Sequence, residues 1–195
     1  MFTGIDVDKD ALELTKRKGH KIIHGSILDL DIGANNYDLI YSSHVIEHVD
    51  NPKLMMEKIS NALKPGGIFV VDTPNLNSWD ASLFASSGHW GGFHFPRHWT
   101  FFTRDTLGKL ANDVGMQEKR IHYLPIPIHW IWSIHSIIAR KYHRPKLARL
   151  IFPLIENRKN IAWSLFLKIT FTIVDYIQRL FSGRTSRMEV WYTKR

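Results

Sequence analysis

The chain has 195 residues, of which 44% are apolar, so it is long enough to bury one sizeable hydrophobic core. It contains no cysteine, which excludes disulfide bonds and thiolate metal sites. The net charge of +8 is unevenly distributed, because the first 118 residues hold 11 Lys and Arg against 15 Asp and Glu, and the remainder holds 15 against 3. We therefore expect two segments with different surfaces and different partners.

Strands and helices alternate along the first two thirds of the sequence. Strands are predicted over residues 1–7, 21–25, 38–42, 68–72 and 118–123. Helices are predicted over residues 9–18, 52–63 and 104–114, each after a capping Asp, Asn or Thr. This alternation predicts an α/β fold with a parallel sheet. The Ser-, Gly-, His- and Trp-rich stretch 73–100 predicts a long functional loop.

Four short motifs follow one another in a fixed order, at residues 3–6, 37–41, 42–48 and 63–71. Their order and spacing resemble the class I S-adenosylmethionine-dependent methyltransferases, in particular the small-molecule enzymes of the quinone-biosynthesis and type 11/12 kind. The resemblance covers residues 2 to about 123 and includes a final strand at residues 188–194. It implies a Rossmann-like sheet, S-adenosylmethionine as the cofactor, and methyl transfer to a small-molecule or lipid-linked acceptor.

The resemblance also implies the residues that contact the cofactor. Asp6 matches the acid that accepts hydrogen bonds from the ribose hydroxyls, although it could instead only cap the next helix. Ser26 and Ile27 stand where the family often has an Asp and a small residue beside the adenine, and Ile27 could equally belong to the core. Ser42-Ser43-His44 matches the floor under the methionine part of the cofactor.

The loop 91–103 resembles the segment that covers the substrate in this subfamily, and it carries His94 and His98. Methyl transfer is an in-line displacement, so the enzyme aligns the acceptor and removes its proton. Histidine suits proton removal near neutral pH. We expect His98 and His94 to be the catalytic residues or to contact the substrate; the alternative is that both are surface polar groups.

Residues His44 to His48 also read as H-x-x-E-H, a pattern of zinc hydrolases. That chemistry requires both histidines on one sustained helix. The five residues lie between a buried strand and a new helix start at Asn51-Pro52, so we expect no metal site and keep a zinc hydrolase as a minor alternative.

The family normally begins with a strand and a glycine-rich G-x-G-x-G loop, and no G-x-G occurs in this sequence. Without that strand, the strands ending at Asp6 and Ser42 flank a gap with unpaired backbone groups. We therefore expect an N-terminally truncated methyltransferase domain over residues 1–123. The alternative is a non-catalytic remnant or binding module.

Residues 124–187 form an apolar, basic insertion before the last strand, 188–195, and include a predicted helix over 161–181. The polar side chains of that helix form a narrow stripe, and Lys168 and Asp175 near its middle argue against a transmembrane helix. One interpretation is a lid or homodimer contact. The other is a peripheral membrane contact through 124–181, which suits a cytoplasmic protein at the inner face of a membrane. Nucleic-acid binding is not expected, because aliphatic residues separate the basic ones.

Overall fold

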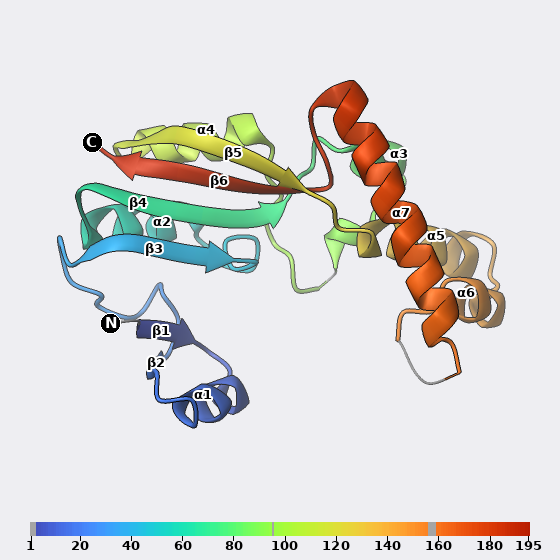
Figure 1. Ribbon diagram of the computed structural model, residues 1–195, viewed down its shortest axis with the longest axis horizontal. Helices are drawn as coiled ribbons and strands as arrows, with labels where there is room; N and C mark the ends of the chain where they lie inside the picture. The colour runs from blue at the N-terminus through green and yellow to red at the C-terminus, as the bar shows by residue number, and fades with distance from the viewer. Residues whose placement is uncertain (1–2, 95, 156–158) are drawn as a thin grey trace.

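The structure is a computed structural model that describes residues 3–94, 96–155 and 159–195 (Figure 1). Its strands are β1 (Thr3–Asp6), β2 (Lys21–His24), β3 (Tyr37–Ser43), β4 (Leu63–Pro74), β5 (Met116–Leu124) and β6 (Arg187–Lys194). Its α-helices are α1 (Lys9–Lys16), α2 (Pro52–Ala62), α3 (Trp79–Phe84), α4 (Arg104–Asp113), α5 (Ile128–Ser136), α6 (Pro145–Ile151) and α7 (Ile161–Ser182). A 3₁₀ turn at Gly91–Phe93 and a π-helical turn at Ile137–Lys141 complete the regular structure.

The strands form two separate sheets. β1 and β2 pair in parallel, and the other four strands lie in the order β3-β4-β6-β5. β3 and β4 are parallel, whereas β6 runs antiparallel to both of its neighbours. The sequence therefore correctly predicted an α/β sheet of the Rossmann-like class I type, but the antiparallel direction of β6 was not predicted.

The break between the sheets falls between β1 and β3, where the sequence predicts a missing strand. No described strand pairs with the open edge of either β1 or β3. Leu39 and Tyr41 on β3 are correspondingly more than half exposed. The expected gap is thus present as two unpaired parallel edges, and such edges are templates for a further strand.

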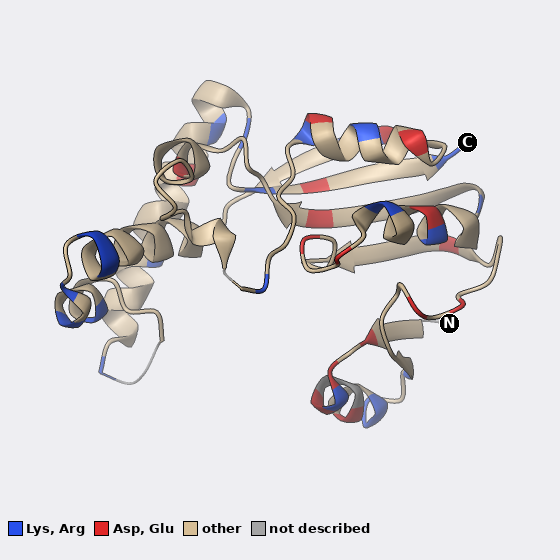
Figure 2. Cartoon of the chain, turned by 180° about the vertical axis from the view of Figure 1, so that it is seen from behind, with Lys and Arg blue, Asp and Glu red and all other residues tan. Residues whose placement is uncertain are grey.

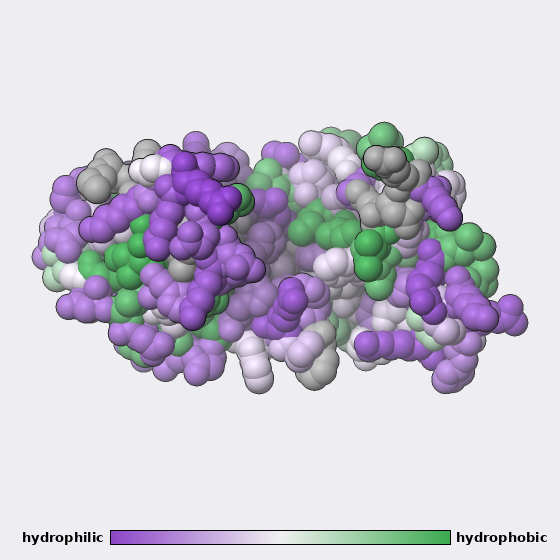
Figure 3. Space-filling view, turned by 90° about the horizontal axis from the view of Figure 1, so that it is seen from below, coloured by the Kyte–Doolittle hydropathy of each residue, from purple (hydrophilic) through white to green (hydrophobic). Residues whose placement is uncertain are grey.

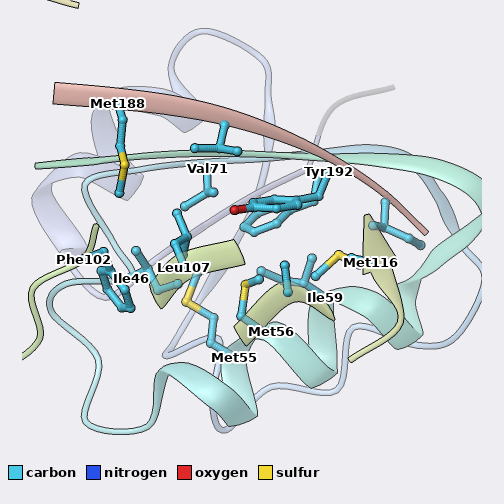
Figure 4. Close-up of a cluster of buried hydrophobic side chains, with 14 residues drawn as sticks. Ile46, Met55, Met56, Ile59, Val71, Phe102, Leu107, Met116, Met188 and Tyr192 are labelled. Atoms are coloured by element: carbon cyan, nitrogen blue, oxygen red, sulfur yellow. The ribbon is translucent and has the colours of Figure 1, made fainter. Parts of the chain in front are cut away.

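The hydrophobic core lies between α2, α4 and one face of the four-stranded sheet (Figure 4). Asn51 caps α2 by accepting the Leu54 N–H at 3.0 Å, and Pro52 occupies the first turn. The buried face of α2 then presents Met55, Met56 and Ile59 to Phe69, Val71 and Tyr192 of the sheet. Burying this many apolar side chains gives the sheet and its two helices one common core.

The other face of the sheet carries no helix within the described part of the chain (Figures 1 and 2). Trp191 on β6 lies there, with the Arg120 guanidinium 4.3 Å from its ring centre. The aromatic ring and the aliphatic part of Arg120 cover some of this face. Helices therefore pack on only one face of the sheet in the described part of the chain.

The helices α5, α6 and α7 lie between β5 and β6 along the chain and form a layer at one end of the sheet (Figure 1). This helical segment follows the end of β5 at Leu124 and precedes the start of β6 at Arg187. One buried carboxylate joins α7 to α5 within this layer, and a second joins α3 to the loop before the 3₁₀ turn. Asp175 of α7 accepts the Trp130 indole N–H at 2.9 Å, and Asp80 of α3 accepts the Trp90 indole N–H at 2.7 Å.

Two local expectations were wrong. The stretch 73–100 is not one loop, because Ser78 caps the short helix α3, whose few residues carry no readable apolar period. The strand predicted over residues 68–72 does not begin after Gly66-Gly67, because these glycines lie within strand β4. Strand β4 instead starts at Leu63 and bulges, so that Tyr37 pairs with Leu63 and Leu39 with Ile68.

Candidate cofactor and acceptor site

Asp6 ends β1 with an exposed carboxylate. One of its oxygens accepts the Asp8 backbone N–H at 2.9 Å. Asp8 itself caps α1 by accepting the Asp10 N–H at 2.8 Å. Since Asp8 does the capping, the second Asp6 oxygen has no hydrogen bond to a described residue and remains available to a ligand.

Ser26 and Ile27 follow β2, beside the end of β1. The Gly25 N–H donates to the Asp6 carbonyl at 3.0 Å, which joins the two strand ends. The Ser26 hydroxyl accepts the Leu28 N–H at 3.1 Å. Ile27 packs against the hydrophobic core, as the alternative to adenine contact expected.

Ser42, Ser43 and His44 end β3 as a group. The buried Ser42 hydroxyl has no hydrogen-bond partner among the described residues. The Ser43 hydroxyl donates to Asp72 of β4 at 2.9 Å. His44 has a positive φ of 51°, and its ring contacts Glu47 at 2.9 Å. The hydrogen bond to this carboxylate raises the pKa of His44.

Glu47 is the buried anchor of the turn after β3. Its carboxylate contacts His44 and also accepts the Thr73 hydroxyl at 3.0 Å. Its backbone carbonyl accepts the Trp99 N–H at 2.8 Å, and this bond holds the loop 91–103 against the end of β3. Segments about fifty residues apart in the sequence thus meet at one place.

Three histidine rings gather at this meeting point. The ring centres of His48 and His98 are 4.6 Å apart, and those of His94 and His98 are 5.2 Å apart. His98 Nδ1 contacts the Gly92 carbonyl at 2.7 Å, and His48 Nδ1 contacts the Arg97 carbonyl at 3.0 Å. A carbonyl only accepts, so each Nδ1 carries the proton and each Nε2 keeps its lone pair when the ring is neutral.

Burial sets the protonation state of the two loop histidines. Desolvation lowers the pKa of His98, and it lowers the pKa of His94 together with the nearby positive charge of Arg97. Both rings are therefore more readily neutral at pH 7 than an exposed histidine. The sequence predicted His98 and His94 at the site but not His48, whose place in the H-x-x-E-H pattern was the available signal.

Glu47, His48 and His98 could together hold a cation, since each offers one ligand atom within 4.8 Å of the others. The carbonyl bonds at Nδ1 of both histidines are of the kind that orients metal-binding imidazoles. This set differs from H-x-x-E-H, because residues 44–48 form a turn rather than a helix, and His44 is bonded to Glu47 instead. The geometry required for the zinc-hydrolase pattern is absent at these residues.

A separate polar pocket of about 320 Å³ opens between the end of β4, the start of α4 and the end of α7. It is lined by Asn75, Arg104, Tyr123 and Arg184, among others. None of the expected site residues lines it, and no sequence motif indicated it.

The residues at the end of β1 suit the ribose of S-adenosylmethionine, and those at the end of β3 suit its methionine part. The free oxygen of Asp6 suits a ribose diol, and the Ser42 hydroxyl is a buried polar group without a partner among the described residues. β1 and β3 run in the same direction, so their carboxyl ends lie on one side of the molecule (Figure 1). The sequence contains no G-x-G, so these residues supply no glycine cradle for the methionine end.

Comparisons with known proteins identify the family of this chain. A family model described as a methyltransferase domain matches residues 2–117. The ubiquinone biosynthesis O-methyltransferase of Cereibacter sphaeroides (strain ATCC 17025 / ATH 2.4.3) is 28% identical over 111 residues, covering 54% of this chain and 45% of that protein. The protein of the same name from Bradyrhizobium sp. (strain ORS 278) is 30% identical over 138 residues, covering 63% and 52%. The chain spans about half the length of these curated relatives.

Solved structures show the same fold. A SAM-dependent methyltransferase from Thermotoga maritima, described as a possible histamine N-methyltransferase, superposes with a TM-score of 0.62 at 15% identity, covering 100% of this chain and 73% of that one. The YcgJ protein of Bacillus subtilis gives a TM-score of 0.59 at 16% identity, covering 99% and 82%. The chain thus belongs to the methyltransferase-domain family and has the partial fold of a class I S-adenosylmethionine-dependent methyltransferase of the type 11/12 kind.

Proposed function

We propose that the protein containing this chain methylates a hydroxyl group of a small, lipid-linked acceptor, and that His98 accepts the proton of that hydroxyl. The observation that carries the proposal is the state of His98. Its Nδ1–H is held by the Gly92 carbonyl, and burial lowers its pKa, so Nε2 is a ready proton acceptor at neutral pH.

When bound, S-adenosylmethionine supplies an electrophilic methyl group on a sulfonium. Asp6, Ser42, Ser43 and His44 would hold the cofactor, which would supply this methyl group to the acceptor oxygen. The hydroxyl proton passes to His98 Nε2. The ring of His98 is positioned for this by His48 and His94, which pack against it edge to face.

His94 is proposed to contact the acceptor and to hold the loop in place. Its ring lies 4.9 Å from the Trp132 ring of α5, centre to centre, which connects the loop to the helical layer. Asp6, Ser42, Ser43 and His44 are proposed to contact the cofactor, from the two strand ends described above. Ser26 and Ile27 contribute at most the edge of that site, because Ile27 packs into the core.

The acceptor class rests on two supports. The curated relatives are named for ubiquinone biosynthesis and for O-methylation, which favours an oxygen acceptor on a quinone precursor. The helical layer beside the site also exposes many large apolar side chains, which suits an acceptor with a hydrocarbon tail. A non-catalytic binding module remains the alternative that the test must separate.

The test is a methyl-transfer assay with labelled S-adenosylmethionine and phenols that differ in tail length. His98→Asn is expected to lower kcat by roughly 10²-fold or more, the usual contribution of a general base, while cofactor binding is kept. The matched control is His20→Asn, which changes an exposed histidine far from the site. Equal kcat for wild type and His98→Asn would refute the assignment of the base. Cofactor binding without any turnover would favour the binding module.

A further inference from the structure

Helix α7 has its polar and apolar faces turned the opposite way from a soluble surface helix. Of its 22 residues, those buried against the protein include Ser164, Asp175 and Gln178. Large apolar side chains point outward instead, with Leu180 and Phe181 more than 80% exposed. The outward set also includes Ile161, Leu165, Phe166, Ile169 and Ile173. A helix in water normally shows the reverse pattern.

One inward polar group, Asp175, attaches α7 to its neighbours, whereas the buried Ser164 hydroxyl and Gln178 amide have no hydrogen-bond partner among the described residues. Asp175 is fully buried and accepts the Ile126 backbone N–H at 2.8 Å and the Trp130 indole N–H at 2.9 Å. The Ser186 hydroxyl donates to the same carboxylate at 3.2 Å. α7 is long and apolar enough to cross a bilayer by length and composition. Crossing would pull Asp175 away from these donors and place it near the bilayer centre, so the helix is placed to lie flat on a membrane rather than to span it.

A basic stretch adjoins the apolar face at one end of α7. Residues 140–149 contain the exposed cations Arg140, Lys141, Arg144, Lys146 and Arg149. The Trp163 indole N–H donates to the Ile151 carbonyl at 2.6 Å, which ties the first turn of α7 to the end of α6. Figure 2 shows these cations gathered at the end of the helical layer farthest from the sheet. Figure 3 shows apolar side chains at the surface of the same half of the molecule.

Charge decides which partner fits this surface. Residues 125–186 contain 10 Lys and Arg but only 2 Asp and Glu, and one of these acids is the buried Asp175. A second copy of the chain would bring two cationic segments together, which costs free energy at low salt. An anionic bilayer offers hydrocarbon for the outward face of α7 and negative headgroups for the cations beside it.

We propose that the α6–α7 surface, meaning the exposed apolar residues of α7 with the cations of 140–149, binds flat to an anionic lipid bilayer. Trp163, partly exposed and stacked on Phe166 at 5.2 Å between ring centres, would lie at headgroup level. The inference is independent of methyl transfer, since lipid binding requires neither cofactor nor turnover. If the proposed function also holds, the surface brings the site next to its lipid-linked acceptor.

The test is flotation of vesicles through a sucrose density gradient, without cofactor. Vesicles of phosphatidylcholine alone are compared with vesicles containing about one quarter phosphatidylglycerol, at about 50 mM and about 500 mM NaCl. We expect binding to the anionic vesicles at low salt. In high salt, or on neutral vesicles, we expect binding to be weaker by roughly tenfold or more. Absence of the protein from the floated anionic vesicles at low salt would overturn the proposal.

Paired variants separate the apolar and the charged contributions. Leu165→Ser with Phe166→Ser is expected to lower vesicle partitioning roughly tenfold or more. The matched control, Leu14→Ser with Leu39→Ser, removes two side chains of similar exposure on other elements and is expected to bind as wild type. Equal partitioning of the two double variants would contradict the inference.

The charge pair is Arg144→Gln with Lys146→Gln against Lys18→Gln with Lys21→Gln. Only the first is expected to weaken binding to anionic vesicles, by roughly tenfold for two cations. Two further outcomes overturn the proposal. Protein that resists extraction at alkaline pH would be spanning the bilayer. A dimer in solution that Leu165→Ser with Phe166→Ser converts to monomer, without vesicle binding by the wild type, would assign the surface to a second copy.

Discussion

Replacing Asp175 tests whether one buried carboxylate holds α7 in its inverted orientation. Asp175→Ala removes the acceptor of the Ile126 and Trp130 N–H groups, which lie at 2.8 and 2.9 Å. A buried donor left without an acceptor costs about 1–3 kcal/mol, so two such donors together cost about 2–6 kcal/mol. The Ser186 hydroxyl keeps a second acceptor in Asp80, at 2.7 Å, and adds little to this sum.

The assay is urea unfolding of the protein followed by tryptophan fluorescence. Asp175→Asn keeps one acceptor oxygen, so its loss of unfolding free energy is expected to be smaller, about 1–2 kcal/mol. Asp113→Ala, in the exposed last turn of α4, is the matched control and is expected to stay within about 0.5 kcal/mol of wild type. An Asp175→Ala protein as stable as this control would refute the view that the carboxylate anchors α7.

Three further predictions concern the loop and the turn after β3. The Glu47 hydrogen bond raises the folded-state pKa of His44, so this contact stabilises the fold below the unfolded pKa of about 6.5, and the stabilisation is lost as pH rises through the folded pKa. His44→Gln should therefore lower the melting temperature more at about pH 5.5 than at about pH 9. An equal loss at both pH values would contradict the reasoning. Because burial lowers the pKa of His98 in the free protein, the acidic limb of the kcat/KM–pH profile should lie below about pH 6.5, and a limb above that value would exclude His98 as the base. A Cβ on Gly91 would lie 2.3 Å from the His129 carbonyl oxygen, so Gly91→Ala is expected to destabilise the protein by about 1–3 kcal/mol in urea unfolding, and wild-type stability would show that the loop adapts freely.

Elements with local sequence signals were predictable. Asn51-Pro52 located the start of α2, and Thr103 located the start of α4, because capping residues act on their immediate neighbours. The gap between β1 and β3 was also predictable, since a parallel sheet that lacks one member leaves both of its neighbours unpaired. These features depend on residues that are close together or on the strand order of the family.

Features that depend on long-range contacts were not predictable. His48 meets His98 only because the Glu47 carbonyl holds a loop about fifty residues further along the chain. Asp80 gives no sign in the sequence that it will be fully buried. The polar stripe of α7 was visible in the sequence. A hydrophobic period shows that a helix has two faces, but it does not show which face packs against the rest of the protein. Here the polar face met it, because Trp130 of α5 offers a donor for a buried acid.

The measurement that tests the central claim most directly is cofactor binding by the purified protein, with labelled S-adenosylmethionine in equilibrium dialysis. We expect saturable binding that Asp6→Ala weakens by roughly tenfold, or about 1.4 kcal/mol, with a melting temperature close to that of wild type, because water can replace the exposed Asp6 carboxylate as acceptor of the Asp8 N–H. Asp10→Ala on the neighbouring helix α1 should bind as wild type. Absence of saturable binding, or equal affinity of wild type and Asp6→Ala, would contradict the claim that the carboxyl ends of β1 and β3 form the cofactor site.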